Sequence, residues 1–168
     1  TNSTISGNAA IGGSGDTDGI AQGGGLHTYW GTLNFVTVYS NTVQGNLPQG
    51  AGVYSYGKTT NIPVIRNSIF AHNTGTALEN GLELFGNVIS ADYNLIEHTS
   101  GITMTGTVAH NIYGFGPALN PLADNGGVTL THSPRLNSHA VDVIPSGVNG
   151  CLPGATIDQT GRSRPVNG

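Results

Sequence analysis

Charged residues are scarce in this sequence. Asp, Glu, Lys and Arg make up 8% of the 168 residues, against about 25% in ordinary globular chains, and only five are Lys or Arg. So few cations argue against the basic patch by which proteins bind nucleic acid or an anionic membrane surface. Runs of about 20 apolar residues are also missing. We therefore expect no nucleic-acid partner and no membrane span.

Cysteine occurs once, at Cys151, so the chain cannot carry a disulfide framework of its own. The thiol is either a small, partly buried side chain or one half of a disulfide whose partner lies outside this chain. No neighbouring residue supplies a base, which argues against a catalytic nucleophile.

Glycine, by contrast, is abundant, with 27 residues, and the apolar residues come in short β-branched runs such as "LNFVTVYS" and "IPVIRNSIF". Short runs of this kind separated by turn-forming residues are typical of strands. The composition therefore predicts an ordered all-β protein with many tight turns and a surface rich in Ser, Thr, Asn and Gly.

A phrase recurs at 2–8 ("NSTISGN"), 35–41 ("FVTVYSN") and 67–73 ("NSIFAHN"), at steps of 33 and 32 residues. Each copy ends in Asn and carries an apolar residue three positions earlier. Side chains alternate between the faces of a strand, so the apolar set marks an inward face. The predicted structural ladder consists of Asn8, Asn41 and Asn73 with Ile5, Val38 and Phe70.

Glycine-rich starts interleave with this repeat: "GGGL" ends at Leu26, "GAGV" at Val53 and "GTAL" at Leu78. Two interleaved repeats predict a right-handed parallel β-helix, a solenoid in which equivalent strands stack about 4.8 Å apart. We expect its rungs over 1–116, a surface-loop insertion at 9–22, and an irregular C-terminal tail over 117–168 that packs on or caps the helix. The alternative is a β-sandwich with frequent turns.

Four segments in the second half strengthen this interpretation: "YNLI" at 93–96, "PLADNGGVTLTH" at 121–132, "SHAVD" at 138–142 and "DQTGRSRP" at 158–165. They resemble right-handed β-helix proteins with a choice-of-anchor Q domain, and "GGGL" and "FAHN" are similar to repeats of polymorphic outer-membrane proteins. The resemblance implies a large secreted or surface-attached bacterial protein, and it transfers no catalytic residue. The family usually closes with a Cys-Asp-Ile-Gly stretch that this chain lacks. That cysteine would be the natural partner of Cys151.

Catalytic and metal-binding patterns are weak. The carboxylates are scattered, and Glu79 and Glu83 in "ENGLE" are interpreted as solvated surface. Lys58 and Arg66 are the only cations of the repeat region, a poor set for a polysaccharide lyase or hydrolase, so we expect no enzyme and no cofactor. The six histidines lack metal-ligand spacing.

Asp16 and Asp18, in "GDTDG", form half of a calcium loop. An exposed turn held by these side chains is the alternative.

Exposed aromatic side chains would mark a glycan-binding surface. Tyr29, Trp30, Tyr54 and Tyr56 form a candidate strip on the glycine-rich strands, with core packing as the alternative. Asn2, in "NST", has the form of a glycosylation acceptor.

The sequence as a whole predicts a structural or adhesive β-helix protein, secreted or on the cell surface. A glycan-binding module and a polysaccharide lyase or hydrolase are the two alternatives. A β-helix exposes unpaired backbone at its ends, and no polar cap is visible where the chain begins. We therefore also expect head-to-tail homo-oligomers or filaments, because contacts that do not close upon themselves propagate.

Overall fold

The computed structural model describes residues 1–14, 19–76, 81–152 and 156–164. Within these residues the protein is all-β: every regular element is a strand, and almost all strands pair in parallel. The described residues contain no helix of the length and apolarity that crossing a membrane requires. The parallel pairing is incompatible with the β-sandwich alternative, whose sheets are antiparallel.

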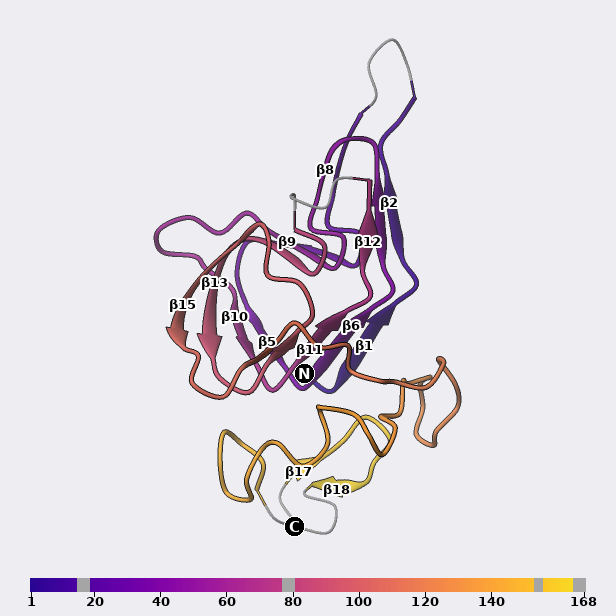
Figure 1. Ribbon diagram of the computed structural model, residues 1–168, viewed down its shortest axis with the longest axis vertical. Coiled ribbons are helices and arrows are strands. Elements are labelled where there is room, and N and C mark those ends of the chain that lie inside the picture. The colour runs from indigo at the N-terminus through magenta and orange to yellow at the C-terminus, as the bar shows by residue number, and fades with distance from the viewer. Residues whose placement is uncertain (15–18, 77–80, 153–155, 165–168) are drawn as a thin grey trace.

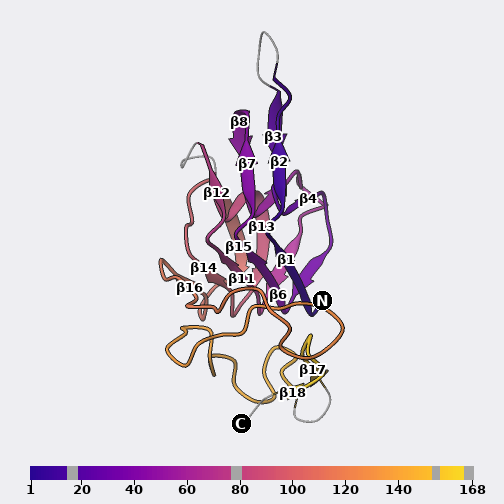
Figure 2. The ribbon, with the colours of Figure 1, turned by 90° about the vertical axis from the view of Figure 1, so that its right-hand side faces the viewer.

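A five-stranded parallel sheet contains one strand from each successive pass of the chain. Its order is β1 (Ser3–Ser6), β6 (Val36–Tyr39), β11 (Ile69–Ala71), β14 (Leu95–Ile96) and β16 (Ile112–Tyr113). Figure 2 shows these strands side by side in that order. We number the passes accordingly: the first runs over 3–34, the second over 36–66, the third over 69–91, the fourth over 95–107, and the fifth begins at 112.

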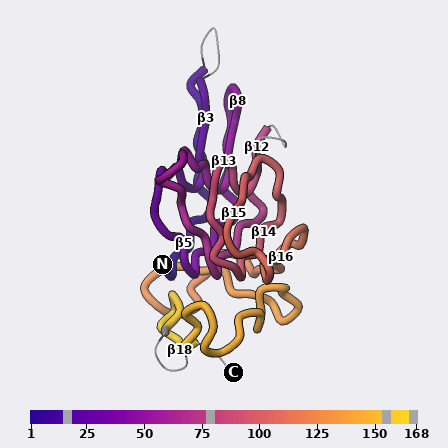
Figure 3. The backbone as a smooth tube through the Cα atoms, turned by 90° about the vertical axis from the view of Figure 1, so that its left-hand side faces the viewer, coloured from indigo at the N-terminus to yellow at the C-terminus, as the bar shows by residue number. Residues whose placement is uncertain are grey.

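A second parallel sheet lies across the core from the first (Figures 1 and 3). It contains β4 (Leu26–Thr28), β5 (Thr32–Asn34), β9 (Val53–Ser55), β10 (Val64–Arg66), β13 (Leu84–Ala91) and β15 (Ile102–Thr107). The long strand β13 pairs with β9 near its start and with β10 near its end, while β15 runs along its other edge.

The predicted surface loop at 9–22 is wrong in part, because this segment contains two strands, β2 (Ala9–Ile11) and β3 (Ile20–Gln22). They pair with β7 (Thr42–Gln44) and β8 (Asn46–Gln49) of the second pass, and β7 also pairs with β12 (Thr74–Gly75). These strands project from the body in Figure 1. We call this projection the strand arm. Its residues form strands because the second pass supplies hydrogen-bond partners for their backbone N–H and C=O groups.

The register places Ile5 beside Val38 and Val38 beside Phe70, in the alignment that the repeat predicts. Their side chains face inward. Val38 and Phe70 are fully buried in a core that lies between the two sheets and also contains Val36, Val53, Ile65, Leu84, Val88 and Ile96. Strand alternation therefore directs one apolar column of the first sheet against the second sheet.

The glycine-rich repeat has a different third member from the one predicted. Leu26 pairs with Val53, and Val53 pairs with Leu84, whereas Leu78 lies outside the described residues. The strand starts share a glycine three positions earlier, and these glycines have φ of 67°, 61° and 71°: Gly23, Gly50 and Gly81. A left-handed backbone at this position is what the repeat requires, and glycine adopts it without strain.

The described residues of the C-terminal tail, 117–152 and 156–164, pack against the outer face of the five-stranded sheet, below the strands in Figure 1. Its only regular structure among the described residues is an antiparallel pair of β17 (Thr156–Ile157) and β18 (Ser163–Arg164), with two isolated bridges. Thr4 Oγ1 donates to Gln159 Oε1 at 2.8 Å, and Ser6 Oγ lies 2.8 Å from His132 Nε2. The outward-facing residues of β1 therefore meet the tail.

Candidate functional site

A column of asparagines follows the strands of the five-stranded sheet. The backbone N–H of Asn8 donates to Asn41 Oδ1 at 3.0 Å, and that of Asn41 donates to Asn73 Oδ1 at 2.9 Å. The Nδ2 groups of Asn41 and Asn73 also donate to the backbone carbonyls of Ile5 and Val38. Asn41 and Asn73 are buried, so these side chains satisfy backbone groups that water cannot reach.

The Glu83 carboxylate accepts the hydrogen bonds from Asn73 that a fourth asparagine of the column would otherwise accept. Its Oε2 accepts hydrogen bonds from the backbone N–H and the Nδ2 of Asn73. In the two preceding passes the equivalent positions are Gly25 and Gly52, where an added Cβ would lie 2.9 Å from the Cγ of Asn41 and 2.8 Å from the Nδ2 of Asn73. In the first two passes an asparagine of the column occupies the space that a side chain here would need. Only the third pass, where the column ends, has room for one.

Glu83 is fully buried and lies within a cluster with Glu97 and His98, which follow β14. One ligand atom from each residue lies within 4.8 Å of the other two, and Glu83 Oε1 is 3.2 Å from His98 Nδ1. Burial raises the pKa of Glu83 to about 7, with Glu97 adding to the rise, although hydrogen bonds from Asn73 and His98 oppose it. This cluster is therefore the strongest candidate for chemistry among the described residues.

Glu97 is anchored by His72, one residue before the last asparagine of the column. The backbone N–H of His72 donates to Glu97 Oε2 at 2.7 Å, and its Nε2 lies 3.6 Å from Oε1. The other ring nitrogen of His72 is 2.8 Å from the hydroxyl of Tyr39. These contacts hold Glu97 against the third pass.

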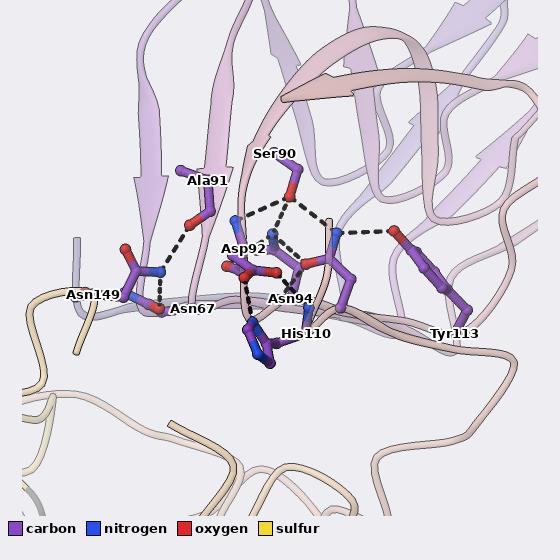
Figure 4. Close-up of polar contacts among 9 residues, drawn as sticks. Asn67, Ser90, Ala91, Asp92, Asn94, His110, Tyr113 and Asn149 are labelled. Carbon is purple, nitrogen blue, oxygen red and sulfur yellow. Dashed lines mark hydrogen bonds and ion pairs between the residues drawn. The ribbon is translucent and has the colours of Figure 1, made fainter. Parts of the chain in front are cut away.

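A second polar cluster lies at the corner after β13 (Figure 4). Ser90 Oγ accepts from the backbone N–H of Asp92 and from the side-chain amides of Asn94 and Asn111, at 3.1, 3.2 and 2.9 Å. Asn94 in turn accepts from the N–H of Ser68 at 3.3 Å, and Asn111 accepts from the N–H of Asn94 at 2.8 Å. This corner thus has its own column of stacked polar side chains.

Asp92 holds His110 at the same corner. Its two oxygens lie 2.7 Å from the backbone nitrogen and 2.6 Å from the Nδ1 of His110, and Tyr93 stacks on the His110 ring. Burial raises the pKa of Asp92, but hydrogen bonds from His110 and from the Tyr93 backbone outweigh it and lower that pKa below its ordinary value. The Asp92 carboxylate and the Tyr93 ring therefore fix the position of His110 at this corner.

The predicted aromatic strip divides into a buried part and an exposed part. Tyr54 is 8% exposed and stacks on Phe85, so the prediction that it contacts glycan is wrong; cross-strand packing covers its ring. Tyr29, Trp30 and Tyr56 are 56%, 74% and 43% exposed. The rings of Tyr29 and Tyr56 lie 5.1 Å apart.

Tyr29 and Tyr56 line a surface hollow of about 150 Å³ with residues 57–58 and 60–61. Lys58 Nζ lies 5.1 Å from the Tyr56 ring centroid. The hollow therefore combines two aromatic rings with a cation at its wall.

A larger cavity of about 440 Å³ separates the five-stranded sheet from the tail. Thr4, Thr37 and Ile69 contribute from the sheet, and Cys151 and Arg164 contribute from the tail. Cys151 is a free, buried thiol in the described structure.

The tail also contacts Asn2, the predicted glycosylation site. Asn2 Nδ2 donates to the carbonyl of Ile157, and Asn2 Oδ1 accepts from Arg164, both at 2.8 Å. A glycan on Asn2 would displace these contacts. Asp16 and Asp18, the predicted calcium ligands, lie outside the described residues, as does Glu79.

Sequence reasoning missed the cluster of Glu83, Glu97 and His98, and its description of the carboxylates as scattered surface groups is wrong for Glu83. The available signal was an alignment of "NGLEL" at 80–84 with "GGGL" and "GAGV", which puts Glu83 in a glycine column. Its proximity to Glu97 and His98 depends on where the fourth pass turns. The chain matches no protein-family model, no curated protein and no solved structure.

Proposed function

We propose that this chain is a right-handed parallel β-helix module of a secreted or cell-surface protein, and that it serves as an adhesive scaffold that binds carbohydrate. The winding is supported by strands about one pass apart that pair in parallel, including Ile5 with Val38 and Val38 with Phe70. The scarcity of charge and the polar, uncharged surface suit an extracellular scaffold.

The observation that carries the binding function is the exposed aromatic hollow, defined by Tyr29, Tyr56 and Lys58, with Trp30 beside Tyr29 in the sequence. Exposed aromatic rings present flat apolar faces, and the C–H face of a pyranose stacks on such rings. Thr60 and Asn61 supply hydroxyl and amide groups for sugar hydroxyls at the rim.

Lys58 gives the hollow a preference among sugars. Its side chain is exposed and forms no ion pair with a carboxylate of the described residues, so the ammonium remains able to pair with an anionic ligand. A charge-assisted hydrogen bond to a sugar carboxylate is stronger than one to a neutral hydroxyl. The expected ligand is therefore a uronate-containing polysaccharide.

A glycan array followed by calorimetry tests this function. Wild-type protein is expected to bind uronate-containing oligosaccharides, and Tyr29→Ala and Tyr56→Ala are expected to weaken binding at least tenfold, because both rings line the hollow. Phe115→Ala is the matched control, because Phe115 is 52% exposed and contacts His139, outside the hollow. Absence of binding by the wild type, or equal loss in the control, contradicts the proposal.

Self-association is a second proposal for the scaffold. Within the described structure β1 is an end strand of its sheet, and β4 and β5 are end strands of the other, so each keeps one unpaired edge. Open edges pair readily with further strands, and a second copy of this chain has open strand edges of its own. Sedimentation showing only monomers at high protein concentration would contradict this assembly.

A further inference from the structure

The cluster of Glu83, Glu97 and His98 has the composition of a metal centre. It presents two carboxylates and one imidazole, the mixed oxygen and nitrogen set that suits zinc and neighbouring divalent transition metals. Calcium is a poorer match, because it takes six to eight oxygen ligands and this cluster has two carboxylate groups.

The distances fit an ion held between the three side chains. Bonds of about 2.0–2.2 Å from a tetrahedral zinc ion place neighbouring ligand atoms about 3.3–3.6 Å apart. Glu83 Oε1 and His98 Nδ1 are 3.2 Å apart, and all three ligand atoms lie within 4.8 Å of one another. The Glu97 carboxylate, whose Oε1 also lies 3.6 Å from His72 Nε2, supplies the third ligand atom at up to 4.8 Å.

Both carboxylates are oriented by contacts outside the cluster. Glu83 Oε2 is taken by Asn73, which leaves Oε1 for a cation, and Glu97 Oε2 is taken by the backbone N–H of His72. Outer-shell hydrogen bonds of this kind position the ligands in protein metal sites. The fully buried Glu83 carboxylate is thus aimed at the half-exposed His98, past which an ion can enter.

No lysine or arginine neutralises the two carboxylates within the described structure, where they form ion pairs with His72 and His98 alone. We propose that Glu83, Glu97 and His98 bind a divalent transition-metal ion of the zinc type, with its remaining position open to water. The ion joins the third pass to the fourth at the point where the asparagine column ends.

Zinc titration of the full chain, freed of metal with EDTA, tests the site. Calorimetry is expected to show one zinc ion per chain, and zinc at 100 times its dissociation constant is expected to raise the melting temperature by about 5–10 °C. Glu97→Gln and His98→Ala are expected to weaken binding by more than about 10-fold, because loss of even an outer-shell partner has an effect of that size. Glu83→Gln is expected to do the same while keeping an oxygen that accepts from Asn73.

His110→Ala is the matched control, because His110 is as exposed as His98 and also lies against a carboxylate, that of Asp92. This variant is expected to bind zinc like the wild type. The proposal fails if millimolar zinc gives no binding, if Glu97→Gln and His98→Ala bind unchanged, or if His110→Ala loses binding equally. Tighter binding of calcium than of zinc would also overturn it.

Discussion

Glu83 accepts two hydrogen bonds from Asn73, the last asparagine of a stacked column, and so ends that column with a buried carboxylate. The column therefore runs from an exposed amide at Asn8 to a charge-bearing group inside the molecule. Its members differ in burial although the repeat makes them equivalent. The difference in burial predicts that the same substitution destabilises the fold to different extents along the column, which the repeat alone does not predict.

Asn41→Ala is expected to destabilise the fold by about 2–5 kcal/mol, because it leaves the N–H of Asn8 and the carbonyl of Ile5 without partners. Asn8→Ala, at the exposed end, is expected to cost under about 1 kcal/mol. Urea unfolding of both variants checks the difference. Equal losses would show that the column is not held together by its buried hydrogen bonds.

Gly52→Ala tests the close approach of the passes. An added Cβ at this position meets the carbonyl oxygen of Glu83 and the Asn73 amide, so we expect a loss of about 1–3 kcal/mol. Gly13→Ala is the control, because nothing lies within 4 Å of its Cβ position. Thermal unfolding that ranks the two variants equally would contradict this steric argument.

The ionisation of Glu83 is expected to lower stability as pH rises in metal-free protein. Its pKa is about 7 in the folded chain and near the ordinary 4.5 in the unfolded chain, so the unfolded chain loses the proton first. Stability relative to Glu83→Gln should therefore fall between about pH 4.5 and 7, by on the order of 3 kcal/mol, and then level off. Denaturant unfolding in EDTA across this range checks it, and a flat or rising difference would refute it.

Asp92 is expected to behave in the opposite way. Its folded-state pKa lies below the ordinary value, so its stabilisation is present above about pH 4 and is lost as pH falls through the folded-state pKa. Asp92→Asn should therefore be less stable than the wild type at pH 7, by about 1–3 kcal/mol, and the gap should close in acid. Asp124→Asn, at an exposed carboxylate, serves as the control and should show no such gap.

Lys58→Gln is expected to reduce binding of uronate-containing oligosaccharides about tenfold and to leave binding of their neutral counterparts nearly unchanged. The substitution removes the cation at the wall of the hollow but keeps a polar side chain of comparable length. Calorimetry with matched charged and neutral oligosaccharides measures the ratio. Equal loss for both ligands would mean that Lys58 supports the hollow without selecting for charge.

Strand positions in the first sheet could be predicted well because each repeat carries its own evidence. Ile5, Val38 and Phe70 alternate with polar residues at a fixed interval, and adjacent passes of a parallel sheet must satisfy each other's hydrogen bonds. The arm at 9–22 was harder to predict, since β2 and β3 are strands only because β7 and β8 lie beside them. The tail was also harder, because its described part has little regular structure.

The interval between like residues, read along the chain, was enough to establish an all-β protein with in-register parallel strands and an asparagine column. Folding alone decided that Glu83 would meet Glu97 and His98, and that Tyr54 would be covered while Tyr56 stayed exposed. Periodic patterns record contacts between equivalent positions. Contacts between unlike positions depend on how far each pass extends before it turns, and no local pattern encodes that distance.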